Sequence, residues 1–118
     1  VNLDISGKYF AMDSEFMTVS LPKSCTPNEV NEVSNYLKTK TSEAVDAGVA
    51  NVIFDTQKVE SLNTEVVKLL LQSMQLCRDL SLNYALAGNE KVVTESKKFE
   101  ESKDWNFCDS IDAAKGSF

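Results

Sequence analysis

The chain of 118 residues contains no histidine, and only three cysteines, two prolines and four glycines. Without histidine, Ser-His and Cys-His catalytic pairs are excluded, and the side chain that most often acts as a general base near neutral pH is missing. Cys25, Cys77 and Cys108 are widely separated and form no Cys-x-x-Cys pair, so neither a disulfide framework nor a common zinc site is predicted. We expect no enzyme activity, no metal, no cofactor, and reduced thiols in a cytoplasmic protein.

The sequence also lacks long apolar runs and clusters of basic residues. No segment approaches the roughly 20 consecutive apolar residues of a membrane-spanning helix, so no membrane insertion is predicted. The formal net charge is −6 and the 12 basic residues are spread along the chain. Because nucleic-acid binding relies on clustered Lys and Arg, these features argue against a nucleic-acid surface and favour a protein partner.

The length is typical of a single domain with one hydrophobic core. Residues 1–7 show no clear periodicity, and we interpret them as a lead-in or linker before a single domain over residues 8–118. The first residue is Val, and no signal-like apolar run follows it. These features indicate a piece of a longer protein or a trimmed chain.

The first half of the chain predicts a strand pair, a long helix and a buried strand. Short apolar and aromatic runs predict strands over Lys8–Ser14 and Phe16–Leu21, joined by a tight turn. Thr26–Glu29 is typical of a helix start, with Thr as the N-cap and Pro at the first helical position. Gly48 is expected to end this helix. The continuous apolar run Val49–Phe54 predicts a central strand covered on both faces.

The next segment predicts the most buried helix of the protein. Apolar residues recur at helical spacing from Val66 to Cys77, and Leu80 ends the pattern. This helix opens at Thr64-Glu65. The apolar run Leu82–Ala87 that follows predicts another strand, with Gly88-Asn89 as its turn.

The last third of the chain is more polar. Val92, Val93 and Phe99 lie among charged residues and predict a third, more exposed helix. The lysines and glutamates from Glu90 to Lys103 are interpreted as a solvated face. Trp105–Cys108 predicts a last short strand, and Ser110 is expected to cap a terminal helix. The predicted order β-β-α-β-α-β-α-β-α indicates an α/β fold in which the later strands run parallel and are covered by helices.

Three segments also carry residues characteristic of a known family. They are Asn51–Asp55 after the helix-ending Gly48, Ser61–Leu71 at the start of the buried helix, and the closing Asp109–Ala114. On these residues and the order of elements, the chain resembles the STAS domain, shared by bacterial anti-sigma factor antagonists and the cytoplasmic tails of sulfate transporters. The resemblance extends from about Lys8 to the end of the chain. It implies a mixed β-sheet flanked by about four helices.

In the antagonist branch of that family, the helix start reads Asp-Ser-Ser-Gly or Asp-Ser-Thr-Gly, and a partner kinase phosphorylates the hydroxyl directly after the Asp. The resemblance aligns Asn63 with the Asp, Thr64 with the phosphorylated hydroxyl, Glu65 with the second hydroxyl and Val66 with the Gly. It therefore implies Thr64 as the phosphorylation candidate, with Ser61 as a second hydroxyl. The structural alternative is that Thr64 or Asn63 simply caps the helix, which is worth about 1 kcal/mol.

Asp55 is the remaining candidate, because it ends the predicted central strand. It could line the crevice where open α/β sheets bind ligands, or it could cap the following loop. The residues expected to contact a partner are Asp55, Ser61, Asn63, Thr64, Glu65, Val66 and Val67.

These features predict a non-enzymatic STAS-type protein-interaction module in bacterial signalling, switched by phosphorylation of Thr64. The resemblance implies an anti-sigma factor or a serine/threonine kinase-like regulator as the partner. One alternative is a constitutive scaffold or regulatory domain of a transporter or larger signalling protein, without phosphorylation. Another is a small-molecule-binding domain that uses the crevice at the strand ends.

Overall fold

A five-stranded mixed sheet forms the centre of the computed structural model, which describes residues 9–118. The strands are β1 (Phe10–Met12), β2 (Phe16–Ser20), β3 (Asn51–Thr56), β4 (Asn83–Gly88) and β5 (Phe107–Cys108), and they lie in the sheet in this order. β1 is antiparallel to β2, whereas β2 to β5 are parallel to one another. The predicted element order and parallel later strands are confirmed. The predicted lead-in and Lys8 lie outside the described residues.

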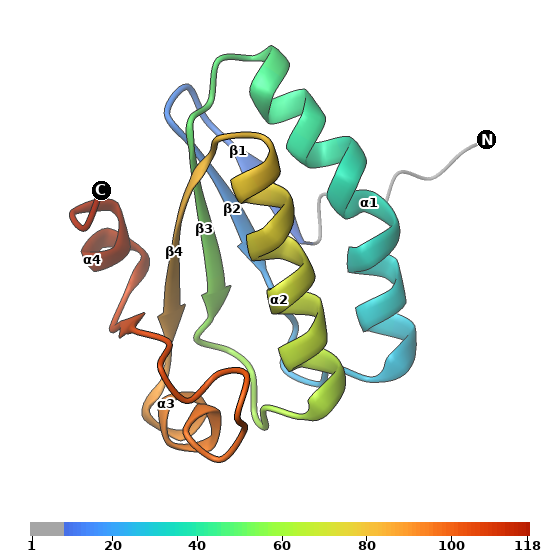
Figure 1. Ribbon diagram of the computed structural model, residues 1–118, viewed down its shortest axis with the longest axis vertical. Helices are drawn as coiled ribbons and strands as arrows, with labels where there is room; N and C mark the ends of the chain where they lie inside the picture. Colours follow the sequence, from blue (N-terminus) through green and yellow to red (C-terminus); the bar gives the residue numbers. More distant parts are fainter. Residues whose placement is uncertain (1–8) are drawn as a thin grey trace.

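Two long helices cover one face of the sheet. The helices are α1 (Pro27–Asp46), α2 (Thr64–Asp79), α3 (Glu90–Ser96) and α4 (Ile111–Lys115). α1 and α2 contact each other on the same side of the sheet, whereas α3 and α4 follow β4 and β5 (Figure 1).

Within residues 9–118, no helix is both long and apolar enough to cross a lipid bilayer.

β3 is buried on both faces, as its continuous apolar sequence predicted. Val52 and Phe54 belong to the main core, which includes the inward faces of α1 and α2. Ile53 points to the opposite face, because side chains alternate along a strand. There it packs with Ala87 of β4 and Ala114 of α4.

α1 ends at the predicted glycine. Gly48 has a positive φ of 82°, its N–H donates to the Val45 carbonyl at 3.1 Å, and the N–H of Val49 donates to the Ala44 carbonyl at 2.8 Å. This pair of hydrogen bonds is a Schellman motif. At the other end, Thr26 occupies the predicted N-cap position, but its side chain makes no capping hydrogen bond. α1 therefore begins where predicted, without the expected side-chain cap.

α3 is shorter than the helix predicted from the sequence. The predicted helix extended to Phe99, whereas α3 ends at Ser96. Beyond it, the fully buried Ser102 donates its hydroxyl to the Ser96 carbonyl at 2.6 Å. This tertiary hydrogen bond satisfies a carbonyl that a continuing helix would have paired, and the chain turns toward β5 instead.

A methyl group at Gly88 should destabilise the fold. Gly88 is the last residue of β4, and a Cβ atom built there would lie 2.7 Å from Thr56 Oγ1 and 2.8 Å from Phe107 Cδ1. Thr56 cannot move without losing the hydrogen bond from its hydroxyl to the Ala87 carbonyl. We expect Gly88→Ala to lower the free energy of unfolding by about 1–3 kcal/mol, measured by urea denaturation.

Gly116→Ala is the matched control. Gly116 has a φ of −73°, and its nearest neighbour to an added Cβ is the Ala113 carbonyl oxygen at 3.6 Å. This substitution should change stability by less than about 0.5 kcal/mol. Equal losses in the two variants would contradict the packing argument for Gly88.

Candidate functional site

Most of the predicted site residues lie at one edge of the sheet. β2, β3 and β4 are parallel and end at Ser20, Thr56 and Gly88, so the loops that follow them meet at their carboxyl ends (Figure 1). Open α/β sheets bind ligands at this edge. Here the loop over residues 57–63 connects β3 to α2 and carries Ser61, and Thr64 follows it as the first residue of α2.

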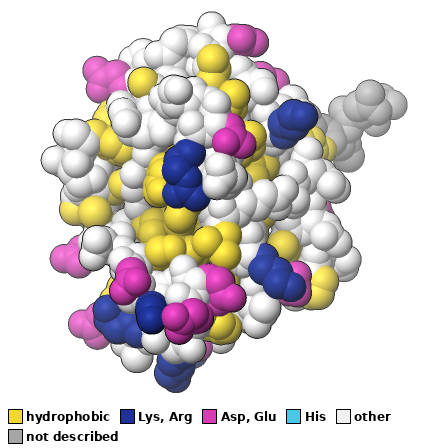
Figure 2. Space-filling model, viewed as in Figure 1, with side chains coloured by type: hydrophobic (Ala, Val, Ile, Leu, Met, Phe, Trp, Pro, Cys, Tyr) yellow, Lys and Arg dark blue, Asp and Glu magenta, His cyan; other side chains and the backbone are white. Residues whose placement is uncertain are grey.

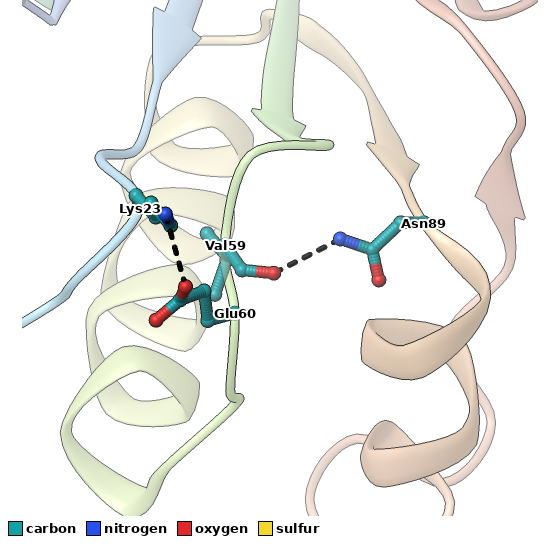
Figure 3. A network of polar contacts seen from close by, with 4 residues as sticks. All are labelled: Lys23, Val59, Glu60 and Asn89. Atoms are coloured by element: carbon teal, nitrogen blue, oxygen red, sulfur yellow. Dashed lines mark hydrogen bonds and ion pairs between the residues drawn. The ribbon is translucent and has the colours of Figure 1, made fainter.

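The amide of Asn89 fixes the first part of this loop. Its Nδ2 donates to the carbonyl of Val59 at 2.9 Å (Figure 3). The same Nδ2 donates to the carbonyl of Gln57 at 2.9 Å, while Oδ1 accepts from the N–H of Val92 at 2.8 Å. The side chain of Val59 is only 1% exposed. One residue therefore caps α3 and holds the β3–α2 loop in place.

Further contacts tie the loop to its neighbours. Lys23 Nζ and Glu60 Oε1 form an ion pair at 3.3 Å, and the N–H of Glu60 donates to the Lys23 carbonyl at 3.0 Å (Figure 3). Both side chains of the ion pair are more than half exposed, so the pair contributes little to stability. Gln57 Nε2 donates to the Asp109 carbonyl at 2.6 Å, which links the loop to the segment before α4.

Asn63, rather than Thr64, caps α2. The Asn63 Oδ1 accepts a hydrogen bond from the N–H of Val66 at 3.0 Å, and its Nδ2 donates to the Cys25 carbonyl at 3.4 Å. Thr64 is the first residue of α2 and is exposed. Within residues 9–118, its hydroxyl has no hydrogen-bond partner. Of the two capping alternatives, the structure therefore selects Asn63 and leaves the Thr64 hydroxyl open to solvent.

Ser61 is exposed but already engaged with an acidic side chain. Its hydroxyl donates to Glu95 Oε2 at 3.3 Å, and the N–H of Leu62 donates to Glu95 Oε1 at 3.2 Å. A phosphate on Ser61 would lie against the Glu95 carboxylate and be repelled by it. Thr64 is therefore the better placed of the two candidate hydroxyls.

Asp55 acts as the cap of the loop. Its Oδ1 accepts a hydrogen bond from the N–H of Gln57 at 3.0 Å, and its carbonyl accepts from the N–H of Leu21 at 2.9 Å. Only 7% of Asp55 is exposed, which leaves little of it for a partner to contact. Of the two roles considered for Asp55, this geometry matches the cap of the following loop.

Val66 and Val67 do not lie on the surface where partner-binding residues were predicted. Their side chains are 0% and 2% exposed and belong to the main core. The inward face of α2 begins within its first turn, so both positions face the sheet. We therefore restrict the candidate surface, called the docking surface below, to Ser61, Asn63, Thr64 and Glu65.

The site offers no nucleophile or metal ligand set among the described residues. Cys25, whose carbonyl binds Asn63, has a thiol pKa raised to about 11 by burial and by the nearby Glu29 carboxylate. It is therefore a protonated thiol near neutral pH. Within residues 9–118, no group of three or more Cys, Asp or Glu side chains is arranged to hold a metal ion. The arrangement offers exposed hydroxyls, a helix start and charged side chains.

Sequence reasoning missed Asn89 and Glu95 as parts of this site. Asn89 was interpreted as a turn residue, although an Asn three residues before an apolar pair is also typical of an N-cap. Glu95 gave no sequence signal, because it lies in a charged segment that was interpreted as a solvated face. Its contact with Ser61 joins residues 34 positions apart.

Comparisons with known proteins find similarity in structure. No protein-family model matches the chain, and no curated protein matches its sequence. The Bacillus cell-fate determinant SpoIIAA in its phosphorylated form matches with a TM-score of 0.65 and 16% identity, over 92% of this chain and 96% of that one. The anti-sigma factor antagonist SpoIIAA in its unphosphorylated form matches with a TM-score of 0.66 and 14% identity, over 92% and 93%.

At this level of identity the likeness establishes the fold. The chain has the STAS-like fold of SpoIIAA, a mixed five-stranded sheet with four helices, and the predicted fold class is confirmed. The match extends over nearly the whole chain.

Removal of the Asn63 amide should weaken the start of α2. Asn63→Ala deletes the acceptor for the Val66 N–H, and we expect the free energy of unfolding to fall by about 1 kcal/mol in urea denaturation. Asn63→Asp loses the donor to the Cys25 carbonyl but keeps an acceptor oxygen and adds negative charge at the positive end of the helix, so it should be more stable than Asn63→Ala. Equal stability of the alanine variant and wild type would refute the capping role.

Proposed function

We propose that this chain is a non-enzymatic STAS-type protein-interaction module of bacterial cytoplasmic signalling. The docking surface receives a regulatory protein, either an anti-sigma factor or a serine/threonine kinase-like regulator. The shared fold with SpoIIAA, named as an anti-sigma factor antagonist, supports this class of partner. The negative net charge and the absence of histidine in the sequence favour protein recognition over nucleic-acid binding or acid-base catalysis.

The exposed hydroxyl of Thr64 carries the proposal of a switch. Asn63 already caps α2, so a phosphate on Thr64 would break no hydrogen bond found among the described residues. The positive end of α2, a 16-residue helix, would stabilise the added negative charge. Lys68 is exposed one helical turn further on and would also favour a phosphate, whereas the adjacent Glu65 would oppose it.

Phosphorylation would act on docking through charge. The unmodified Thr64 hydroxyl is neutral and small, whereas a phosphate adds nearly two negative charges and three acceptor oxygens. A partner that packs against the neutral surface would have to bury this charge or withdraw from it. Phosphorylation of Thr64 therefore weakens docking.

A second candidate function is a constitutive scaffold within a transporter or a larger signalling protein. The observation that favours it is Glu65, which aligns with the second hydroxyl of the family pattern and is exposed in the first turn of α2. A carboxylate there supplies a permanent negative charge beside Thr64. A partner that contacts this charge would bind without any need for phosphorylation.

Incubation with ATP and extract of the source cells should add one phosphate to the wild-type chain, detected by intact mass. Thr64→Ala should remove this phosphorylated form, because it deletes the open hydroxyl. Ser61→Ala, at the other hydroxyl of the docking surface, and Thr94→Ala, at an exposed hydroxyl outside it, should retain it. Persistence of the phosphorylated form in Thr64→Ala would refute the phosphorylation switch at Thr64 and favour the constitutive scaffold.

Charge at Thr64 should also control recovery of a bound partner. We expect Thr64→Glu to reduce recovery of the partner captured by wild type about tenfold, the effect of an unfavourable contact of roughly 1.4 kcal/mol. Thr39→Glu adds the same charge to the exposed side of α1 and should leave recovery unchanged. Quantitative mass spectrometry measures the ratio, and equal recovery with Thr64→Glu contradicts charge control.

A further inference from the structure

An apolar hollow lies beside the second half of α2, away from the docking surface. It has a volume of about 390 Å³, and its walls include Leu71, Met74, Tyr84, Leu86 and Trp105. Hydrophobic side chains gather in a continuous patch near the centre of the view in Figure 2. The docking surface is at the opposite, N-terminal end of α2, so the hollow is a separate feature.

The short β5 strand explains why this hollow is open. β5 has two residues and pairs only with Leu86 and Ala87 of β4. Among the residues that the structure describes, the first part of β4, from Asn83 to Ala85, therefore has no neighbouring strand on that side. The segment that carries Trp105 forms one wall of the hollow instead of a paired strand.

Arg78 provides a positive charge at the wall of the hollow. It is the only arginine in the chain. Its guanidinium donates through Nη1 to the Tyr84 hydroxyl at 2.9 Å and through Nη2 to Gln75 Oε1 at 3.2 Å. Within residues 9–118, no carboxylate forms an ion pair with it. Because a guanidinium has five N–H donors, several remain available to a ligand while Tyr84 and Gln75 hold the group in position.

We propose that this hollow binds a small amphiphilic carboxylate. The apolar body of the ligand packs against Leu71, Met74 and Trp105, and its carboxylate accepts hydrogen bonds from Arg78. The volume lies within the range of about 300–1,000 Å³ typical of small-molecule sites. The flexible side chain of Met74 adapts to different apolar shapes, and the planar guanidinium fork matches a carboxylate.

The charge and composition of the walls select this ligand class. A cationic amphiphile would be repelled by Arg78, and a neutral one would leave the available guanidinium donors without a new acceptor. A nucleotide would bring several charges to walls that are mainly apolar and carry only one basic side chain. A ligand with a single carboxylate on an apolar body can pair its charge with Arg78 and pack its apolar part against the hydrophobic walls.

Trp105 makes the proposal directly testable, because it is the only tryptophan in the chain. The full chain is titrated with decanoate, and the tryptophan emission is recorded alongside titrations with decanol and decyltrimethylammonium. We expect decanoate to produce a saturable shift to shorter wavelength as it displaces water from the indole. Decanol should bind at least about tenfold more weakly, because it lacks the charge-assisted hydrogen bonds, and the cation should not bind.

Two variants separate the charge from the apolar walls. Arg78→Gln should weaken decanoate binding at least about tenfold while leaving decanol binding unchanged. Leu71→Glu places a carboxylate on a half-buried wall position and should abolish decanoate binding. Lys97→Gln removes an exposed positive charge outside the hollow and should have no effect. Circular dichroism checks that each variant is folded.

Several results would overturn the proposal. These are equal affinity for decanoate and decanol, unchanged decanoate binding in folded Arg78→Gln, or an absence of any saturable emission shift. Light scattering could give one further result against the proposal. A stable dimer that dissociates in Leu71→Glu would show that a second copy of the chain, rather than a small carboxylate, covers the hollow.

Discussion

Burial of β3 on both faces is the constraint on which the rest of the structure depends. Val52 and Phe54 face the core under α1 and α2, while Ile53 faces Ala114 of α4. A strand that is apolar on both faces must be covered from both sides, which requires helices on each face and parallel crossover connections. The parallel strands then end at one edge, and the loop that carries Ser61 and Asn63 is brought to that edge as a consequence.

The conformation of that loop depends on contacts from elements far along the chain. Asn89 holds the carbonyls of Gln57 and Val59, and Glu95 accepts hydrogen bonds from the Ser61 hydroxyl and the Leu62 N–H. Since Asn89 caps α3 and Glu95 lies in its last turn, the docking surface is stabilised by α3 as well as by α2 itself. The surface is a tertiary feature rather than a local motif.

α2 connects two surfaces of different chemistry. Its first turn presents Thr64 and Glu65 to solvent, and its last turn carries Arg78 at the apolar hollow. Between them, one face of the helix is buried in the core. Polar groups concentrate at helix ends because the terminal N–H and C=O groups lack partners within the helix, whereas the middle turns are free to bury apolar side chains.

The sequence by itself determined the order of elements, the parallel sheet, the ends of α1 and the helix start at Thr64, because each depends on local periodicity or capping chemistry. It also supported the STAS-like fold through the residues around Asn51–Asp55 and Ser61–Leu71. Only the tertiary structure decided that Asn63 caps α2, that Val66 and Val67 are buried, and that Glu95 engages Ser61. The contact of Glu95 with Ser61 joins residues 34 positions apart, and such contacts leave no periodic signal in the sequence. Asn63 and Thr64 are both residue types that can cap a helix, so only the geometry of the chain at the start of α2 selects one of them.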